Sequence, residues 1–328
     1  MDNILVTGGA GYIGSHACKA LKNRGFNPVT FDSLITGWKD SVKFGPFVKG
    51  DLLDPRSIEQ VFSEWKPKAV MHFAALSEVA TSVNTPELYW RNNVLGSLNL
   101  LEAMLKANCH HLVFSSTCSI YGENDSVMVN EDSPTNPLNP YAASKRAVED
   151  MISGIVAATE LKVIRFRYFN VSGADPEGQI GEFHRPETSL IPLVLENIKA
   201  VSGQIEIFGD DYPTADGTCI RDYIHVEDLV HAHILGLNAL FAGSKKDEVY
   251  NLGNGNGFSV KEVINCCLRV TNKQVPVIIK SRRAGDASAI VSGSEKAKLE
   301  LGWRCQYPEI DNIVSHSWNW IKHGAYQK

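Results

Sequence analysis

Hydrophobic and polar positions in the first half of the chain alternate between two periods. Short apolar runs rich in β-branched residues predict buried parallel strands at Ile4–Val6, Pro28–Asp32, Phe47–Gly50, Ala69–Ala75 and Leu112–Ser116. Segments of helical period separate most of them, at Ser15–Arg24, Ser57–Trp65 and Glu87–Ala107. This alternation predicts an α/β fold with a doubly wound parallel sheet, whose ligand lies at the carboxyl ends of the strands.

The second half of the chain mixes short strands and helices and predicts a smaller, mixed α/β domain. We place the boundary near residue 170, so that residues 1–170 form the doubly wound Rossmann domain and residues 171–328 the second domain. The segment from Arg221 to about Leu240 is expected to return to the first domain.

Three glycines follow the first predicted strand at intervals of three. Gly8, Gly11 and Gly14 stand between this strand and a helix, where backbone N–H groups and the helix dipole favour a phosphate. A glycine-rich turn without a ligand is the alternative. The second strand ends in Asp32, eighteen residues after Gly14, where a carboxylate accepts hydrogen bonds from an adenosine ribose and repels a 2′-phosphate. The glycine turn together with Asp32 favours NAD over NADP as the cofactor.

Composition excludes several partners. The 328 residues carry a net charge of −5 without a basic block, so nucleic acid and anionic membranes are poor partners. The first strand begins almost at the N-terminus and no apolar run approaches the roughly 20 residues of a membrane span, so we expect a cytoplasmic protein. The seven cysteines lack a CxxC pair, and His231 and His233 do not face each other on a helix; we expect reduced thiols and no metal.

Two more predicted strand ends carry candidate chemistry. Asp51 suits an adenine contact, although an acid at a helix N-terminus would explain it too, a role that Asp54 fills better. The strand from His111 to Thr117 ends in hydroxyl residues that lie at the active-site edge of such a sheet, or that bond loop backbone.

A tyrosine and a lysine share one face of the next helix, which we predict from Tyr141 to Thr159. Tyr141 and Lys145 stand four residues apart, and an ammonium near a phenol lowers the phenol pKa and makes it a usable base. A YxxxK pair alone is weak, but here it follows a dinucleotide fingerprint and a Ser/Thr-rich strand end.

With these motifs the chain resembles the extended short-chain dehydrogenase/reductase family and, within it, the UDP-glucose (UDP-galactose) 4-epimerases. The matching stretches run through nearly the whole chain: VTGGAGYIGSH, GDLLD, HFAAL, NNVLGSLNLLEAM, VFSSTCSIYG, NPYAASK, RYFNVSGADPEG, IFGDDYPTADGTCIRDYIHVEDL, YNLGNG and RRAGD. The resemblance implies an isomerase that holds NAD tightly and passes through a 4-keto sugar. It also implies a homodimer through helices at Tyr89–Ala107 and Tyr141–Thr159, whose apolar faces packing within one chain would explain equally well.

The resemblance assigns roles residue by residue. Tyr141 would be the base, Thr117 would hydrogen-bond the sugar 4-oxygen, and Lys145 would bridge the nicotinamide ribose. The implied NAD contacts are Gly8, Gly11, Tyr12, Ile13, Gly14, Asp32, Ser33, Asp51, Leu52, Phe73, Ala74, Ala75, Asn92, Ser115, Tyr141, Lys145, Tyr168 and Phe169. The implied UDP-sugar contacts are Thr117, Asn170, Ser189, Leu190, Phe208, Arg221, Arg283 and Asp286. Tyr168 and Phe169 could equally be core aromatics, and Arg282–Arg283 a solvated surface pair.

A few positions distinguish or depart from relatives. Related dehydratases carry an acid just after the catalytic threonine, whereas Cys118 and Ser119 stand here, which favours an epimerase. The run Ser77–Ser82 departs from the family pattern and puts the cofactor contacts of that loop in doubt; Ser189 replaces a more usual Asn or His. Ile290 leaves open whether hexoses, N-acetylhexosamines, glucuronate or pentoses are preferred. The alternatives are an epimerase of another UDP-sugar and a non-catalytic NAD-binding regulator.

Overall fold

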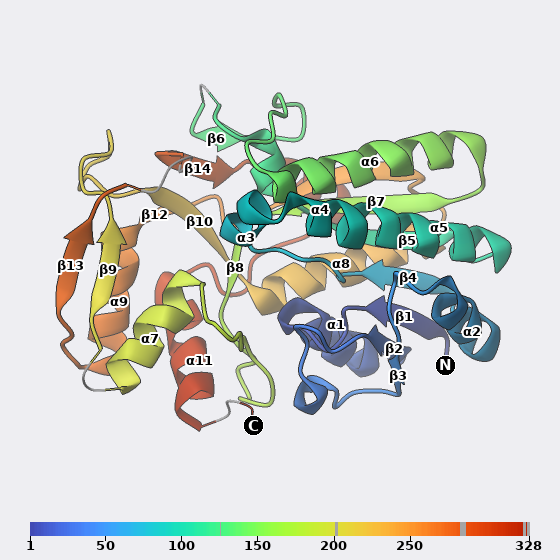
Figure 1. The fold of residues 1–328 in the computed structure, drawn as a ribbon, viewed down its shortest axis with the longest axis horizontal. Coiled ribbons are helices and arrows are strands. Elements are labelled where there is room, and N and C mark those ends of the chain that lie inside the picture. The colour runs from blue at the N-terminus through green and yellow to red at the C-terminus, as the bar shows by residue number, and fades with distance from the viewer. Residues whose placement is uncertain (125, 201–202, 283–286, 324–325, 327–328) are drawn as a thin grey trace.

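A seven-stranded parallel sheet, with six strands from residues 3–168 and one from residues 247–252, organises the molecule (Figure 1). The computed structural model describes residues 1–124, 126–200, 203–282, 287–323 and 326. The strand order is β11-β7-β5-β4-β1-β2-β3 and every neighbouring pair is parallel. The strands are β1 (Asn3–Thr7), β2 (Asn27–Asp32), β3 (Phe47–Lys49), β4 (Ala69–His72), β5 (His111–Thr117), β7 (Lys162–Tyr168) and β11 (Asp247–Leu252).

Helices cover both faces of this sheet, and its central strands β1 and β4 are accordingly mostly apolar. Along β1, Ile4 and Val6 pack into one core and Leu5 into the other, because successive side chains of a strand point to opposite faces. The first core lies under α1 (Tyr12–Asn23) and α8 (Val226–Phe241); the second lies under α2 (Pro55–Trp65), α5 (Gly96–Lys106) and α6 (Pro140–Ala158). The predicted doubly wound α/β architecture is confirmed.

The second half of the chain completes the first sheet. Helix α8 packs on α1, β5 and β7, and β11 extends the sheet beside β7. Strand β11 was not among the predicted strands. The segment from Arg221 to about Leu240 was expected to return to the first domain. Residues 220–225 instead form β10, which belongs to a different sheet, so the chain returns to the first sheet only at α8.

A smaller unit stands beside the carboxyl ends of the large sheet (Figure 1). Its sheet joins β6 (Met128–Val129), β8 (Asn170–Ser172), β10 (Ile220–His225), β12 (Gly257–Ser259) and β14 (Ala289–Ser292), and β9 (Ile205–Phe208) pairs with β13 (Val277–Lys280). Helices α7 (Leu190–Lys199), α9 (Val260–Thr271) and α11 (Ile310–His323) share a third core, while α10 (Glu295–Leu301) packs on α8 and β11.

The helix predicted at Glu87–Ala107 is not one regular α-helix. After α3 (Val79–Asn84), the chain forms α4 (Pro86–Tyr89), a π-helical turn at Trp90–Leu95 and then α5. Within the π turn, the side-chain amide of Asn93 hydrogen-bonds both the N–H and the carbonyl of Leu76. The hydrophobic period of the sequence does not predict such an interaction or the turn that accompanies it. Short 3₁₀ turns occupy Lys39–Ser41 and Cys118–Tyr121. No helix among the described residues combines the length and apolar character needed to cross a bilayer.

Candidate active site

A cleft of about 410 Å³ runs along the carboxyl ends of the large sheet. It lies between that sheet and the smaller unit, where an open α/β sheet places its ligands. Twenty of the predicted site residues line it: Gly8, Gly11, Tyr12, Ile13, Gly14, Asp32, Ser33, Asp51, Leu52, Phe73, Ala74, Ala75, Asn92, Thr117, Tyr141, Lys145, Tyr168, Phe169, Asn170 and Ser189.

The glycine turn that lines the cleft excludes larger residues at Gly8 and Gly14. A Cβ on Gly14 would lie 2.1 Å from the carbonyl oxygen of Gly8, and Gly8 itself has a φ of +71°. Helix α1 begins directly after Gly11, with neither a side-chain cap nor an acid in its first turn. Its first backbone N–H groups therefore face the cleft as the donors a diphosphate requires.

Asp32 ends β2 and is almost fully buried beside this turn. One carboxylate oxygen accepts from the N–H of Ala10 at 3.0 Å and the other from the N–H of Leu34 at 2.8 Å. Burial raises the pKa of Asp32, and the two backbone hydrogen bonds counteract this. The fixed carboxylate retains lone pairs for ribose hydroxyls. The loop that follows, with Ile35, Thr36 and Gly37, also lines the cleft and was not predicted.

Asp51 also lies on the cleft wall. Its side chain accepts from the N–H of Leu53 at 2.9 Å, while Asp54 accepts from the N–H of Arg56 as the N-cap of α2. The capping role is therefore filled by Asp54, and Asp51 lines the cleft without capping the helix.

Tyr141, Lys145 and Thr117 all line the cleft. Asn139 caps α6 by accepting from the N–H of Ala142 at 2.9 Å, which fixes Tyr141 in the first turn of the helix. The Thr117 side chain lies close enough to the Tyr141 hydroxyl to lower the pKa of the phenol, and the Lys145 ammonium donates to the carbonyl of Ser115 at 2.8 Å. Sequence spacing thus brings a buried phenol, hydroxyl and amine together.

The pKa of Tyr141 differs from the sequence expectation. Lys145 was expected to lower it, but burial raises it well above its usual value, and the hydrogen bond from Thr117 offsets only part of that rise. Burial also lowers the pKa of Lys145 to about 8, against the charge of Glu149. The i,i+4 spacing predicts that Tyr141 and Lys145 lie close together, but it does not predict their burial, which is the main cause of both pKa shifts.

Six predicted residues do not line the cleft: four lie elsewhere among the described residues, and two lie outside them. Ser115 is buried outside the cleft lining; its carbonyl accepts from Lys145, and its side chain hydrogen-bonds His233 at 3.4 Å. Leu190, Phe208 and Arg221 are not part of the cleft lining; Arg221 donates to the carbonyl of Ile220 at 2.9 Å. Arg283 and Asp286 lie outside the described residues.

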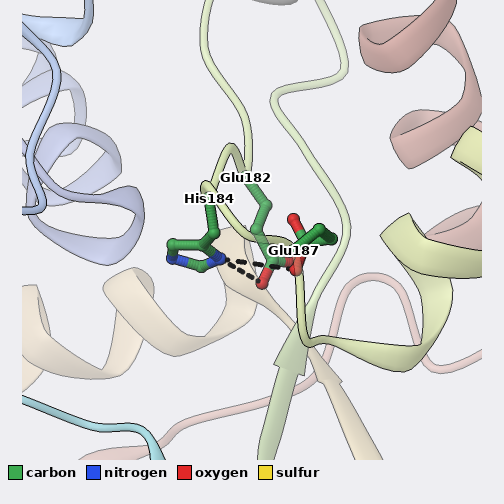
Figure 2. A group of neighbouring side chains, drawn as sticks. All are labelled: Glu182, His184 and Glu187. Atoms are coloured by element: carbon green, nitrogen blue, oxygen red, sulfur yellow. Dashed lines mark ion pairs between the residues drawn. The ribbon is translucent and has the colours of Figure 1, made fainter.

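Two lining residues that were not predicted, Glu182 and His184, come from the loop between β8 and α7. Figure 2 shows the imidazole of His184 pointing between the carboxylates of Glu182 and Glu187. The His184 Nδ1 atom lies 3.4 Å from Glu182 and 3.5 Å from Glu187. Burial opposes a charge on His184, but hydrogen bonds to both carboxylates outweigh it and raise its pKa to about 10. No periodicity marks these loop residues in the sequence.

Comparison with known proteins identifies close relatives. Residues 4–253 match the NAD dependent epimerase/dehydratase family. A UDP-glucose 4-epimerase of Halalkalibacterium halodurans is 45% identical over 97% of this chain and 95% of its own length. A crystal structure of a UDP-glucose 4-epimerase is 49% identical over 100% of both chains, with a TM-score of 0.96. The UDP-glucose 4-epimerase of Brucella ovis, solved in complex with NAD, is 41% identical over 97% of this chain and 98% of that chain, with a TM-score of 0.94.

Proposed function

Since the chain belongs to the NAD dependent epimerase/dehydratase family, we propose that it is an NAD-dependent UDP-glucose 4-epimerase that interconverts UDP-galactose and UDP-glucose. The family resemblance seen in the sequence is thereby confirmed. The observation that carries the proposal is the buried contact of Tyr141 with Thr117 beside Lys145, in a cleft that the glycine turn also lines.

The residues around the cleft fit NAD. The backbone donors after Gly11 suit its diphosphate, and the carboxylate of Asp32 suits the adenosine ribose hydroxyls. Lys145 would hold the nicotinamide ribose, and Tyr168 and Phe169 would flank the ring. When bound, NAD supplies a reversible hydride acceptor for the sugar C4.

Tyr141 moves the proton in this proposal. In its ionised form it removes the proton from the sugar 4-hydroxyl as the 4-keto sugar forms, and it returns that proton after the 4-keto sugar has rotated in the site and its C4 has been reduced again on the opposite face. Burial of the phenol makes proton uptake favourable, and the ammonium of Lys145 supplies nearby positive charge when Tyr141 is ionised. Thr117 bonds the phenol and orients the 4-oxygen.

The cleft also explains why epimerisation is favoured over dehydration. Elimination of water needs an acid beside the threonine, but Cys118 and Ser119 line that position. Burial raises the pKa of the Cys118 thiol to about 12, so it stays neutral at physiological pH. Ser119 is held by Thr117, which accepts from the Ser119 N–H at 3.1 Å.

The substrate contacts in this proposal include groups on and off the described cleft. Asn170 and Ser189 line the cleft and would contact the diphosphate and sugar. Phe208 would pack on uracil, and Arg221, Arg283 and Asp286 would hold the diphosphate and ribose, with Leu190 nearby. A guanidinium suits bidentate phosphate recognition. Ile290 packs with Ile120 and Tyr121 and leaves the choice among UDP-sugars to experiment.

We propose further that two copies associate through the face formed by α3, α4 and the π turn, next to α6. Leu88, Trp90 and Leu95 are each more than 40% exposed there, and Val83 of α3 is 62% exposed. These elements adjoin one another, and exposed apolar side chains on adjoining elements support a protein interface. Sedimentation of the wild type as a dimer and of Trp90→Glu as a monomer would support this interface; a wild-type monomer would exclude it.

The seven cysteines are all free thiols, and five of them are buried. Free thiols are typical of proteins in a reducing compartment, and we propose that this protein functions in the cytoplasm.

The test is turnover of UDP-galactose by purified protein without added NAD, with UDP-glucose detected by a coupled dehydrogenase. We expect product from the wild type and from Tyr307→Phe, and a loss of at least about 100-fold in Tyr141→Phe, the range that general acid–base groups contribute. Tyr307 is a suitable control because it packs against His225 and His316, away from the cleft. Full activity of Tyr141→Phe would contradict the assigned roles; no product from the wild type, with or without NAD, would contradict the proposed reaction.

A further inference from the structure

We propose that Glu182, His184 and Glu187 bind one divalent transition-metal cation, with Zn²⁺ the expected occupant, at the wall of the cleft. The three residues come from the loop between β8 and α7, and Figure 2 shows their polar ends directed at one another. The proposal concerns a binding site and does not depend on the epimerase reaction.

The ligand atoms already have the separations of a coordinated metal. His184 Nδ1 lies 3.4 Å from the nearer oxygen of Glu182 and 3.5 Å from that of Glu187, and all three ligand atoms lie within 4.8 Å of one another. In a tetrahedral zinc site with bonds of 2.0–2.1 Å, neighbouring ligand atoms are about 3.3 Å apart. A cation would therefore need only a small closing of the carboxylate of one glutamate towards the other.

Charge and burial also favour a cation. The side chains of Glu182 and Glu187 are 6% and 3% exposed, so water screens neither carboxylate well. Among the ion pairs of the described residues, His184 is their only cationic partner. Arg185, the next residue, is bound to Glu196 instead. The two carboxylates around one imidazolium carry a net charge of −1. A divalent cation would displace the imidazole proton, because a ligating imidazole is neutral, and it would bring the net charge of the site to zero.

Hydrogen bonds fix the carboxylates in place. Glu182 accepts from the hydroxyl of Ser189 at 2.5 Å, and Glu187 accepts from the N–H groups of Thr188 and Ser189 at 2.8 Å. The oxygens that accept these bonds are also the ones nearest His184 Nδ1, so a cation would bind through a lone pair that they keep or through the other oxygen of each carboxylate. One imidazole and two carboxylates suit Zn²⁺, Co²⁺ or Mn²⁺ better than a thiolate-seeking metal.

The site would have an open side towards the cleft. Glu182 and His184 line the cleft, whereas Glu187 does not. Three protein ligands leave a coordination position for water or for an oxygen of a bound ligand. A cation there would add positive charge to this wall of the cleft, and it would connect the loop before α7 to that wall.

The test uses full-length protein without a histidine tag, stripped of metal by a chelator and then titrated with Co²⁺. We expect one equivalent per chain, with a visible absorption band of four- or five-coordinate Co²⁺ that Zn²⁺ abolishes by displacement. Glu187→Gln and His184→Gln should each weaken Co²⁺ binding by at least about 100-fold, because the loss of even an outer partner weakens metal sites by about 10–100-fold. The control His323→Gln removes an exposed histidine at the end of α11 and should bind like the wild type.

Glutamine at position 187 retains an acceptor oxygen for the Thr188 and Ser189 N–H groups, so this variant should fold. Circular dichroism checks that it does. No saturable band up to millimolar Co²⁺ in the wild type would overturn the proposal. A band that survives unchanged in both Glu187→Gln and His184→Gln would overturn it too, because the ion would then lie elsewhere.

Discussion

The buried pair of Glu149 and Arg167 offers the sharpest test of how this fold is stabilised. Glu149 lies on α6, four residues after Lys145, and its carboxylate accepts from Arg167 at 2.6 and 3.1 Å and from Ser116 at 2.5 Å. The two charged side chains are 2% and 7% exposed. Burial alone would lower the pKa of Arg167, but the bonds and charge of Glu149 raise it well above its usual value.

Glu149→Gln leaves Arg167 charged and buried without a counter-ion. Breaking a buried pair in this way costs about 3–5 kcal/mol of unfolding free energy, and the amide oxygen of Gln still accepts one N–H, so we expect about 3 kcal/mol. The control is Asp150→Asn, the next residue on α6, whose pair with Arg146 is 62% and 36% exposed and should contribute less than about 1 kcal/mol. Replacing both buried partners, as Glu149→Leu with Arg167→Met, should recover most of the loss.

The assay is urea unfolding followed by tryptophan fluorescence, at low and at high salt. Urea is preferred because guanidinium is itself a salt and screens ion pairs. The Glu149→Gln loss should persist in high salt, since water and ions do not reach the pair, whereas any Asp150→Asn loss should vanish. Equal losses in the two variants, or a double variant less stable than Glu149→Gln, would refute the reasoning.

Three further predictions concern the cleft and its support. Gly14→Ala places a Cβ 2.1 Å from the Gly8 carbonyl, so purified protein should contain at least about 10-fold less NAD by extraction; wild-type content would contradict the close approach. Lys145→Met should reduce turnover of UDP-galactose at least about 100-fold with folding intact by circular dichroism, and full turnover would exclude a role for the ammonium. Burial raises the Glu227 pKa from 4.5 to about 7. Between these two pH values the folded protein holds a proton that the unfolded chain releases, so the protein loses stability as the pH rises from 4.5 to 7. The Glu227 side chain is 27% exposed, so we discount the full effect of the shift and expect Glu227→Gln to raise the unfolding free energy, measured in urea, by about 2 kcal/mol at pH 8 and not at pH 4.5. Equal gains at the two pH values would contradict the raised pKa.

Much of the large sheet follows from the sequence because its strands are buried on both faces. Ile4–Val6 and Leu112–Ser116 read as apolar runs that only a covered parallel sheet explains. Strand β11 escaped prediction because Asp247, Glu248 and Asn251 interrupt its apolar pattern, and its partner β7 lies about 80 residues earlier in the chain. Pairing over such a distance leaves no local signal.

The cleft was predictable where residues end strands and unpredictable where they sit on loops. Asp32, Asp51 and Thr117 lie where parallel strands end, so topology alone brings them together. Glu182 and His184 reach the cleft only because the smaller unit places their loop there. The raised pKa of Tyr141 was not predicted for a related reason: it results from burial, and burial depends on neighbours far away in the sequence.

The contribution of α8 and β11 to the first sheet has a consequence for synthesis of the protein on the ribosome. The sheet lacks its β11 edge, and one of its cores lacks α8, until residue 252 has been made. At about 5–20 residues per second, the N-terminal half then waits roughly 4–16 s after residue 170 emerges, with apolar surface uncovered. Chaperones that bind nascent chains would therefore engage this protein before its cofactor site can close, and a gene fragment ending at residue 170 should yield aggregates.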